Sequence, residues 1–203
     1  MTDLIQRTIA MEWNMFDKIQ NLGGRASCQE NPTTFNIMRS SQFKAWTPEL
    51  LQSYYQDLVS AKAFGQNLLS EKYAYMMERT NPKEYEAIKD KLPQRTPKAM
   101  EIIQTLCGIQ VAWLEDLSQR YPFLTNRGRS IQQTQDQQTG TSFETYLWGE
   151  LATYSPRTLN LYAAYVTQLH QTGCNLNEMV LQNTVEQYGY TSMDAAEQDL
   201  SEK

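Results

Sequence analysis

The sequence predicts an all-α fold: a single multi-helix bundle of about eight helices with a polar internal pocket. Helix-start signals recur along the chain, and apolar residues between them follow the helical period, whereas no alternating β pattern of useful length occurs. With 203 residues, 40% of them hydrophobic, the chain can form one domain with a sizeable core, which we place over residues 1–203. The start signals are a capping residue followed by proline, at Asn31-Pro32, Thr47-Pro48, Asn81-Pro82, Thr96-Pro97 and Ser155-Pro156.

The helices of the N-terminal half follow in order from these signals. A first helix over residues 3–21 ends before Gly23, because glycine readily adopts the left-handed conformation that terminates helices. Three more helices begin at the first three capping pairs, and Glu84 adds a capping box to Asn81. They are expected over residues 33–46, 48–79 and 82–91.

The C-terminal half contains a long interruption between its helices. A helix is expected over residues 97–120, and residues 122–141, which include a Gln-rich run, are predicted to be a long loop. A loop of that length in a compact domain indicates a mobile or functional segment. Further helices are expected over residues 142–154, 156–173 and 176–188, with a short turn of helix at 192–200.

Composition excludes several classes of function. The net charge is −5 and no Lys/Arg-rich run occurs, which argues against nucleic acid as a partner. No apolar stretch approaches the ~18 residues of a membrane span, and the N-terminus lacks the apolar core of a signal peptide. The three cysteines are scattered and are expected to be free thiols. We therefore expect a cytoplasmic protein with no membrane partner.

Metal and cofactor chemistry is not predicted. The one histidine, His170, has no glutamate three residues before it, so the Glu-x-x-His motif of di-iron bundles is absent. Three distant cysteines and one histidine make no zinc pattern. No nucleophile elbow and no Gly-rich phosphate loop is found either, and we expect neither a metal nor a cofactor.

Five predicted helices carry polar residues on the face that should be apolar. Successive residues turn about 100° around a helix axis. On that wheel Glu12 lies at the centre of its apolar arc, between Ile5 and Ile19. A buried carboxylate is costly unless it is paired or hydrogen-bonded, so the pattern predicts a shared polar cavity of the kind in which bundles bind ligands. The other residues of this type are Arg39, Gln42, Lys72, Gln110 and Glu150.

Such a cavity suits acid–base chemistry on an anionic or polar metabolite. A carboxyl group in an apolar wall has a raised pKa, which favours Glu12 and Glu150 as general acid or base. Cys28 follows a glycine turn that could bind an anion and activate the thiol, and it is the third candidate catalytic residue. Structural ion pairs, and a spare small residue at Cys28, are the alternatives. The candidate substrate-binding residues are Arg25, Arg39, Gln42, Lys72, Gln110 and Tyr146.

Several runs of the sequence carry a family resemblance. They are Glu12–Gln29, Ile37–Arg39 with Ser41–Phe43, Tyr54–Leu58, Glu71–Ala74, Thr141–Leu147 with Gly149–Leu151, and Asn183–Val185 with Tyr188–Tyr190. Together they resemble a bacterial family, domain of unknown function 4125, over nearly the whole chain. The resemblance implies no nameable activity. It does imply a common site, because the matching runs contain most of the polar residues that the helical periodicity set apart. Some relatives are joined to, or partnered with, a nucleotidyltransferase-like domain, which this sequence lacks.

Three functions remain as alternatives. The first is an enzyme that uses buried carboxylates for cofactor-independent acid–base chemistry on a small anionic molecule. The second is a non-catalytic ligand-binding or regulatory partner of a nucleotidyltransferase-like protein, which predicts a broad exposed apolar patch. The third is a structural homo-oligomer in which the polar core residues set the helix register.

Overall fold

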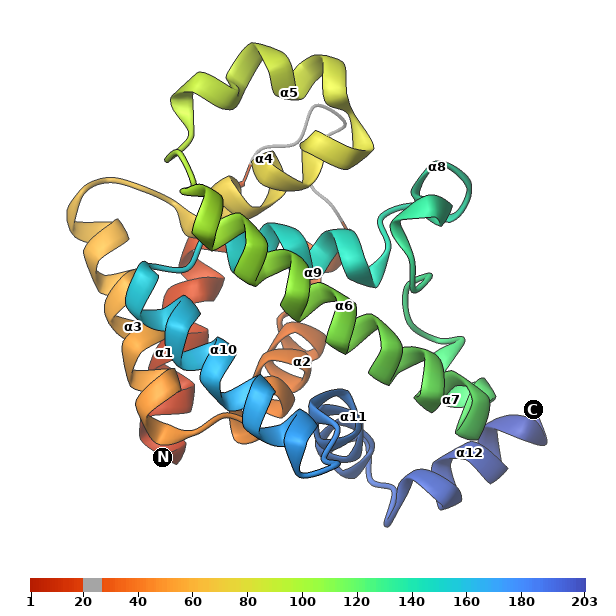
Figure 1. The fold of residues 1–203 in the computed structure, drawn as a ribbon. Coiled ribbons are helices and arrows are strands. Elements are labelled where there is room, and N and C mark those ends of the chain that lie inside the picture. The colour runs from red at the N-terminus through yellow and green to blue at the C-terminus, as the bar shows by residue number, and fades with distance from the viewer. Residues whose placement is uncertain (20–26) are drawn as a thin grey trace.

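The computed structural model describes residues 1–19 and 27–203. Within these ranges it consists of twelve α-helices and three short 3₁₀ helices, with no β-strand, which confirms the all-α class (Figure 1). The α-helices are α1 (Thr2–Phe16), α2 (Pro32–Lys44), α3 (Pro48–Ala63), α4 (Leu68–Thr80), α5 (Pro82–Ile88), α6 (Pro97–Arg120), α7 (Pro122–Thr125), α8 (Asp136–Thr139), α9 (Phe143–Ala152), α10 (Pro156–Gln171), α11 (Leu176–Gln187) and α12 (Met193–Ser201). The 3₁₀ helices are η1 (Ser27–Glu30), η2 (Lys89–Lys91) and η3 (Gln133–Gln135).

The predicted helix starts agree with the structure to within one residue, because the signals that set them are local. The side chains of Asn31, Thr47, Thr96 and Ser155 each accept a hydrogen bond from the backbone N–H three residues later. Each bond satisfies one of the amide groups that have no partner in the first turn of a helix. Asn81 makes no such bond, so the capping box predicted there is wrong.

The helix predicted over residues 48–79 is in fact two helices. Gly65, with φ of +69°, terminates α3, and the N–H of Gln66 reaches back to the carbonyl of Ala61 at 2.8 Å. Asn67 then caps α4 by accepting from the Ser70 N–H, and its own amide donates to the carbonyl of Met15 at 2.8 Å. This break gives α4 its own direction and places it against α1 and α9.

Residues 122–141 hold short helical turns rather than the long structureless loop expected there. The helix α7 packs on α12, where the Glu197 carboxylate accepts from the N–H groups of Phe123 and Leu124, both at 2.8 Å. The Asp136 carboxylate accepts from the Ser142 N–H and the Thr145 hydroxyl, both at 2.7 Å. These bonds tie both ends of the segment to neighbouring helices.

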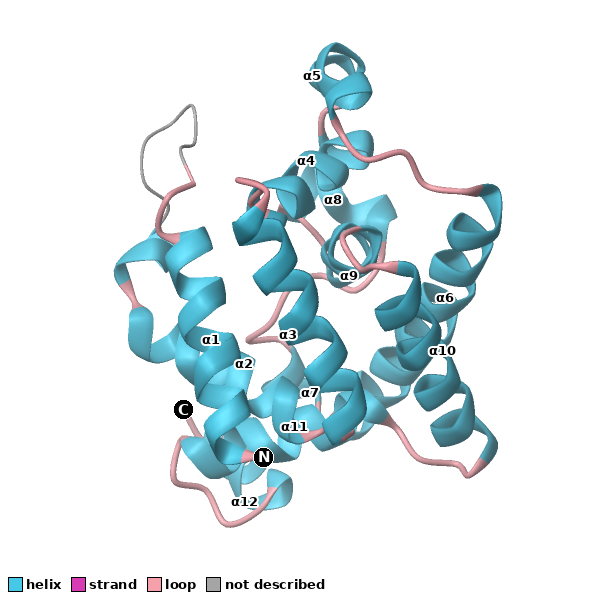
Figure 2. Ribbon diagram, turned by 90° about the vertical axis from the view of Figure 1, so that its left-hand side faces the viewer, coloured by secondary structure: helices cyan, strands magenta, loops and turns pink. Residues whose placement is uncertain are grey.

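Four helices bring the polar residues together. The helix α1 packs against α2, α3 and α4, and α9 packs against both α4 and α6 (Figures 1 and 2). Gly149 allows the close approach of α4 to α9, since a Cβ at that position would lie 2.5 Å from Met76 Cγ and 2.7 Å from the carbonyl oxygen of Lys72. No helix in the described part of the chain combines the length and apolarity needed to cross a bilayer.

Candidate functional site: a buried ion network beside a cationic pocket

Glu12 is fully buried and is held by two other helices. The Arg39 guanidinium on α2 donates to both carboxylate oxygens, from Nε to Oε2 at 2.7 Å and from Nη2 to Oε1 at 2.5 Å. The Tyr54 hydroxyl on α3 donates to Oε1 at 2.6 Å. Glu12 therefore accepts three hydrogen bonds, two of them in the bidentate geometry that arginine favours with carboxylates.

Glu150 on α9 occupies the other side of the same guanidinium. Arg39 Nη1 donates to Glu150 Oε1 at 3.2 Å, and Lys72 Nζ on α4 donates to Oε2 at 2.7 Å. The Gln42 amide and the Tyr154 hydroxyl also donate to Oε1, both at 3.1 Å. We call Glu12, Arg39, Glu150 and Lys72 the ion network; its formal charges sum to zero.

The electrostatics of Glu150 reverse what the sequence predicts. Burial alone would raise the pKa of its carboxyl group, but the charges of Arg39 and Lys72 outweigh burial and hold that pKa well below its usual range. The raised pKa predicted for Glu150 is therefore wrong. Burial and the nearby carboxylates instead raise the pKa of the Tyr54 and Tyr154 phenols well above the ordinary value.

A pocket of about 400 Å³ lies beside the ion network. Its described lining contains three cations, Arg39 on α2, Lys72 on α4 and Arg129 between α7 and η3, and contains no carboxylate. Both carboxylates of the network lie behind the cations that they bind. The remaining lining residues are polar or apolar: Asn31, Thr34, Tyr146, Phe16, Phe35, Met38, Leu69 and Tyr73.

The ring of Tyr146 contacts both a buried cation, Lys72, and an exposed one, Arg129. Lys72 Nζ lies 3.4 Å from the centroid of its ring, and the guanidinium carbon of Arg129 lies 4.6 Å from it. Arg129 is exposed, and its Nη1 donates to the carbonyl of Thr141 at 3.1 Å. Both contacts are cation–π interactions, which also orient the two cations toward the pocket.

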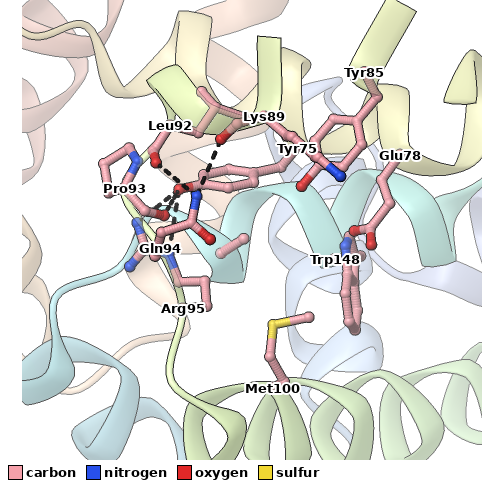
Figure 3. A pocket seen from close by; sticks show the side chains of 11 residues that line it. Tyr75, Glu78, Tyr85, Lys89, Leu92, Pro93, Gln94, Arg95, Met100 and Trp148 are labelled. Atoms are coloured by element: carbon pink, nitrogen blue, oxygen red, sulfur yellow. Dashed lines mark hydrogen bonds between the residues drawn. The ribbon is translucent and has the colours of Figure 1, made fainter. Parts of the chain in front are cut away.

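A second, smaller hollow lies between α4, α5, α6 and α9 (Figure 3). It has a volume of about 130 Å³, below the ~300–1,000 Å³ of typical small-molecule sites. The Tyr75 hydroxyl in its wall donates to the carbonyl of Pro93 at 2.6 Å and accepts from Arg95 Nη2 at 3.0 Å. None of the site residues predicted from the sequence lines this hollow.

The structure brings six predicted site residues together and leaves one apart. The six are Glu12, Arg39, Gln42, Lys72, Tyr146 and Glu150. Gln110 is buried elsewhere: its Oε1 accepts from the Tyr162 hydroxyl at 3.1 Å, and it does not line the pocket. The structure thus places Gln110 outside the pocket lining, and its part in a shared site stays a prediction. Arg25 and the Cys28 side chain lie outside the described residues.

Three residues of the site, Tyr54, Tyr154 and Arg129, are not predicted from the sequence. Tyr54 and Tyr154 lie on apolar helix faces, where a tyrosine is indistinguishable from an ordinary core residue. Arg129 lies in the segment predicted as a loop, where periodicity carries no information about direction. The sequence signal for Arg129 is the pair of basic residues, Arg127 and Arg129, on either side of Gly128.

Comparison with known proteins gives a family match. A family model described as "Protein of unknown function (DUF4125)" matches residues 2–198, in agreement with the resemblance seen in the sequence. No curated protein and no solved structure matches the chain.

Proposed function

Because the chain belongs to the DUF4125 family, whose description assigns no function, we propose one from the site: the protein binds an anionic small molecule in the pocket beside Lys72. The observation that carries this proposal is the separation of charge. Three cationic residues line the pocket, while Glu12 and Glu150, which balance two of them, do not. Coulomb attraction is stronger at a partly buried site than in water, so an anion gains more there than at the surface.

The cations keep hydrogen-bond donors for a ligand. An ammonium group has three N–H donors. Lys72 uses one of them on Glu150 and directs another toward Tyr146, which leaves one donor for a ligand. Arg129 donates to one backbone carbonyl and lies at the solvent side of Tyr146. Lys72 therefore supplies the inner contact for an anionic group and Arg129 the outer one.

The other half of the pocket favours an apolar or aromatic group on the same ligand. The rings of Phe16 and Phe35 stack with centroids 5.3 Å apart, and Met38 and Leu69 lie in the same lining. A volume of about 400 Å³ falls within the ~300–1,000 Å³ range of small-molecule sites. Phenyl phosphate combines an anion with a flat ring and is a suitable probe.

In this proposal the two carboxylates hold the cations Arg39 and Lys72 in place and do not contact the ligand. Glu12 accepts three hydrogen bonds and Glu150 accepts five from four residues, and neither lines the pocket. Since the pKa of Glu150 is held low, it is a poor proton carrier near neutral pH. The geometry thus favours binding over an enzyme whose acid–base groups are Glu12 and Glu150.

The test is the affinity for phenyl phosphate compared with its neutral analogue, benzyl alcohol, measured by ligand-observed NMR. We expect wild type to bind phenyl phosphate at least about tenfold more tightly, about 1.4 kcal/mol. Lys72→Met should remove this preference, and Arg129→Gln, at an exposed position, should reduce it without affecting folding. Lys62→Met, which removes an exposed lysine at the end of α3, is the matched control. Equal affinity of wild type for both compounds would contradict the proposal.

A further inference from the structure

We propose that Tyr146 is the proton-transfer group of this pocket: its phenolate takes a proton from a ligand held by the cations, and its phenol returns one. The inference rests on the proposed anion-binding function and adds a reaction to it. It assigns the acid–base role, which the sequence predicts for Glu12 and Glu150, to a residue that lines the pocket.

The geometry around the ring favours a negative charge on Tyr146. Lys72 Nζ lies 3.4 Å from the ring centroid, on a side chain that is 3% exposed, so its charge is little screened. Glu150 holds that ammonium in place through the 2.7 Å contact to its Oε2. Arg129 contacts the ring from the exposed side of the site and contributes a weaker, screened attraction.

The charged groups that face Tyr146 come from several elements and do not cancel. Burial raises the pKa of the phenol; the charge of Lys72 lowers it, Glu150 on the same helix raises it and Arg39 on α2 lowers it again, with a net lowering. The buried phenols of Tyr54, Tyr154 and Tyr162 shift the opposite way, because burial dominates there. Tyr146 is therefore distinct from the tyrosines of the aromatic core.

Other proton carriers are poorly placed for this role. The described lining contains no carboxylate, histidine or cysteine. Cys107 is buried on α6, where burial raises the pKa of its thiol to about 12. His170 packs near Trp113, with ring centroids 6.1 Å apart, and does not line the pocket.

The step needs no additional reactant. The phenolate oxygen of Tyr146 forms an O–H bond as the C–H or O–H bond of the ligand breaks, and the electron pair of that bond stays on the ligand. The negative charge moves from the phenolate to the ligand and remains close to Lys72. The substrate class is thus an anionic molecule that carries an acidic C–H or O–H group beside its anionic group.

The test is a spectrophotometric titration of tyrosinate in the intact protein. We expect wild type to show one tyrosine that ionises below the ordinary value of about 10. Tyr146→Phe, which keeps the ring and its packing, should remove that step. Tyr188→Phe is the matched control, because Tyr188 is 54% exposed and does not line the pocket. Superimposable curves for wild type and Tyr146→Phe would overturn the inference.

Two further measurements separate this inference from the proposed function. Lys72→Met should move the early step up by about 1–3 pH units, the usual effect of one adjacent charge. Saturating phenyl phosphate should also move it up, because a bound anion disfavours a phenolate beside it. If phenyl phosphate binds but no early step depends on Tyr146, the inference alone fails. If the early step is present but phenyl phosphate does not bind, the anion-binding proposal fails instead.

Discussion

Arg39 and Glu12 meet through two parallel hydrogen bonds, Nε to Oε2 at 2.7 Å and Nη2 to Oε1 at 2.5 Å, with side-chain exposures of 9% and 0%. The third nitrogen of the guanidinium, Nη1, reaches Glu150 on α9. One buried cation therefore links two carboxylates from helices that lie far apart in the sequence. The same network fixes the position of Lys72 at the pocket wall, so the proposed ligand binding depends on the same contacts as the stability of the fold.

Glu12→Gln should destabilise the protein strongly. The substitution removes the main charge partner of Arg39 inside the core, and breaking one side of a buried pair costs about 3–5 kcal/mol. Urea denaturation measures this as a fall in the free energy of unfolding. Glu178→Gln, in the solvent-exposed pair with Arg120, is the control and should cost about 0.2–1 kcal/mol. Equal costs for the two substitutions would mean that the buried network adds no stability.

Stability should fall in acid through Glu150. Its pKa is lower in the folded protein than in the unfolded chain, where it is about 4.3. The unfolded state therefore takes up a proton first, so the contribution of Glu150 is complete above about pH 4.3 and is lost as the pH falls toward the folded-state pKa. Urea unfolding from pH 7 to 3 should show a shallower pH dependence for Glu150→Gln than for wild type. Glu101→Gln, at an exposed position of α6, should keep the wild-type slope.

Gly149→Ala should destabilise the contact between α4 and α9. The added Cβ would overlap Met76 and the backbone of Lys72, and such overpacking typically costs about 1–3 kcal/mol. Gly108→Ala in α6 is the matched control, because no atom lies within 4 Å of its added Cβ. Removing a helical glycine there should stabilise the protein by about 0.5–1 kcal/mol. Thermal or urea unfolding compares the two, and a stabilised Gly149→Ala would contradict the packing described.

The sequence predicts where the helices begin because the residues that cap a helix lie next to it in the chain. Thr47 and Ser155 cap the helices that follow them, as expected. The sequence predicts one helix across Gly65 because apolar periodicity continues on both sides of it. The local signals are Gly65, which ends α3, and Asn67, which caps α4; the contact of Asn67 with Met15 then fixes the new direction of the chain.

The site is predicted in part for the same reason. Periodicity shows that Glu12, Lys72 and Glu150 point inward, since that depends on one helix alone. It does not show which partners they meet. The pKa of Glu150 is lowered rather than raised because of Arg39, which lies more than a hundred residues away in the sequence. Gln110 points inward too, but α6 directs it to Tyr162 instead of the pocket.

The most direct test of the proposed function is a crystal structure of the protein soaked at saturating phenyl phosphate. We expect the phosphate within hydrogen-bond distance of Lys72 Nζ, beside Tyr146, with the phenyl ring against Phe16 and Phe35. A phosphate bound away from Lys72, or a pocket that stays empty at saturation, would contradict it.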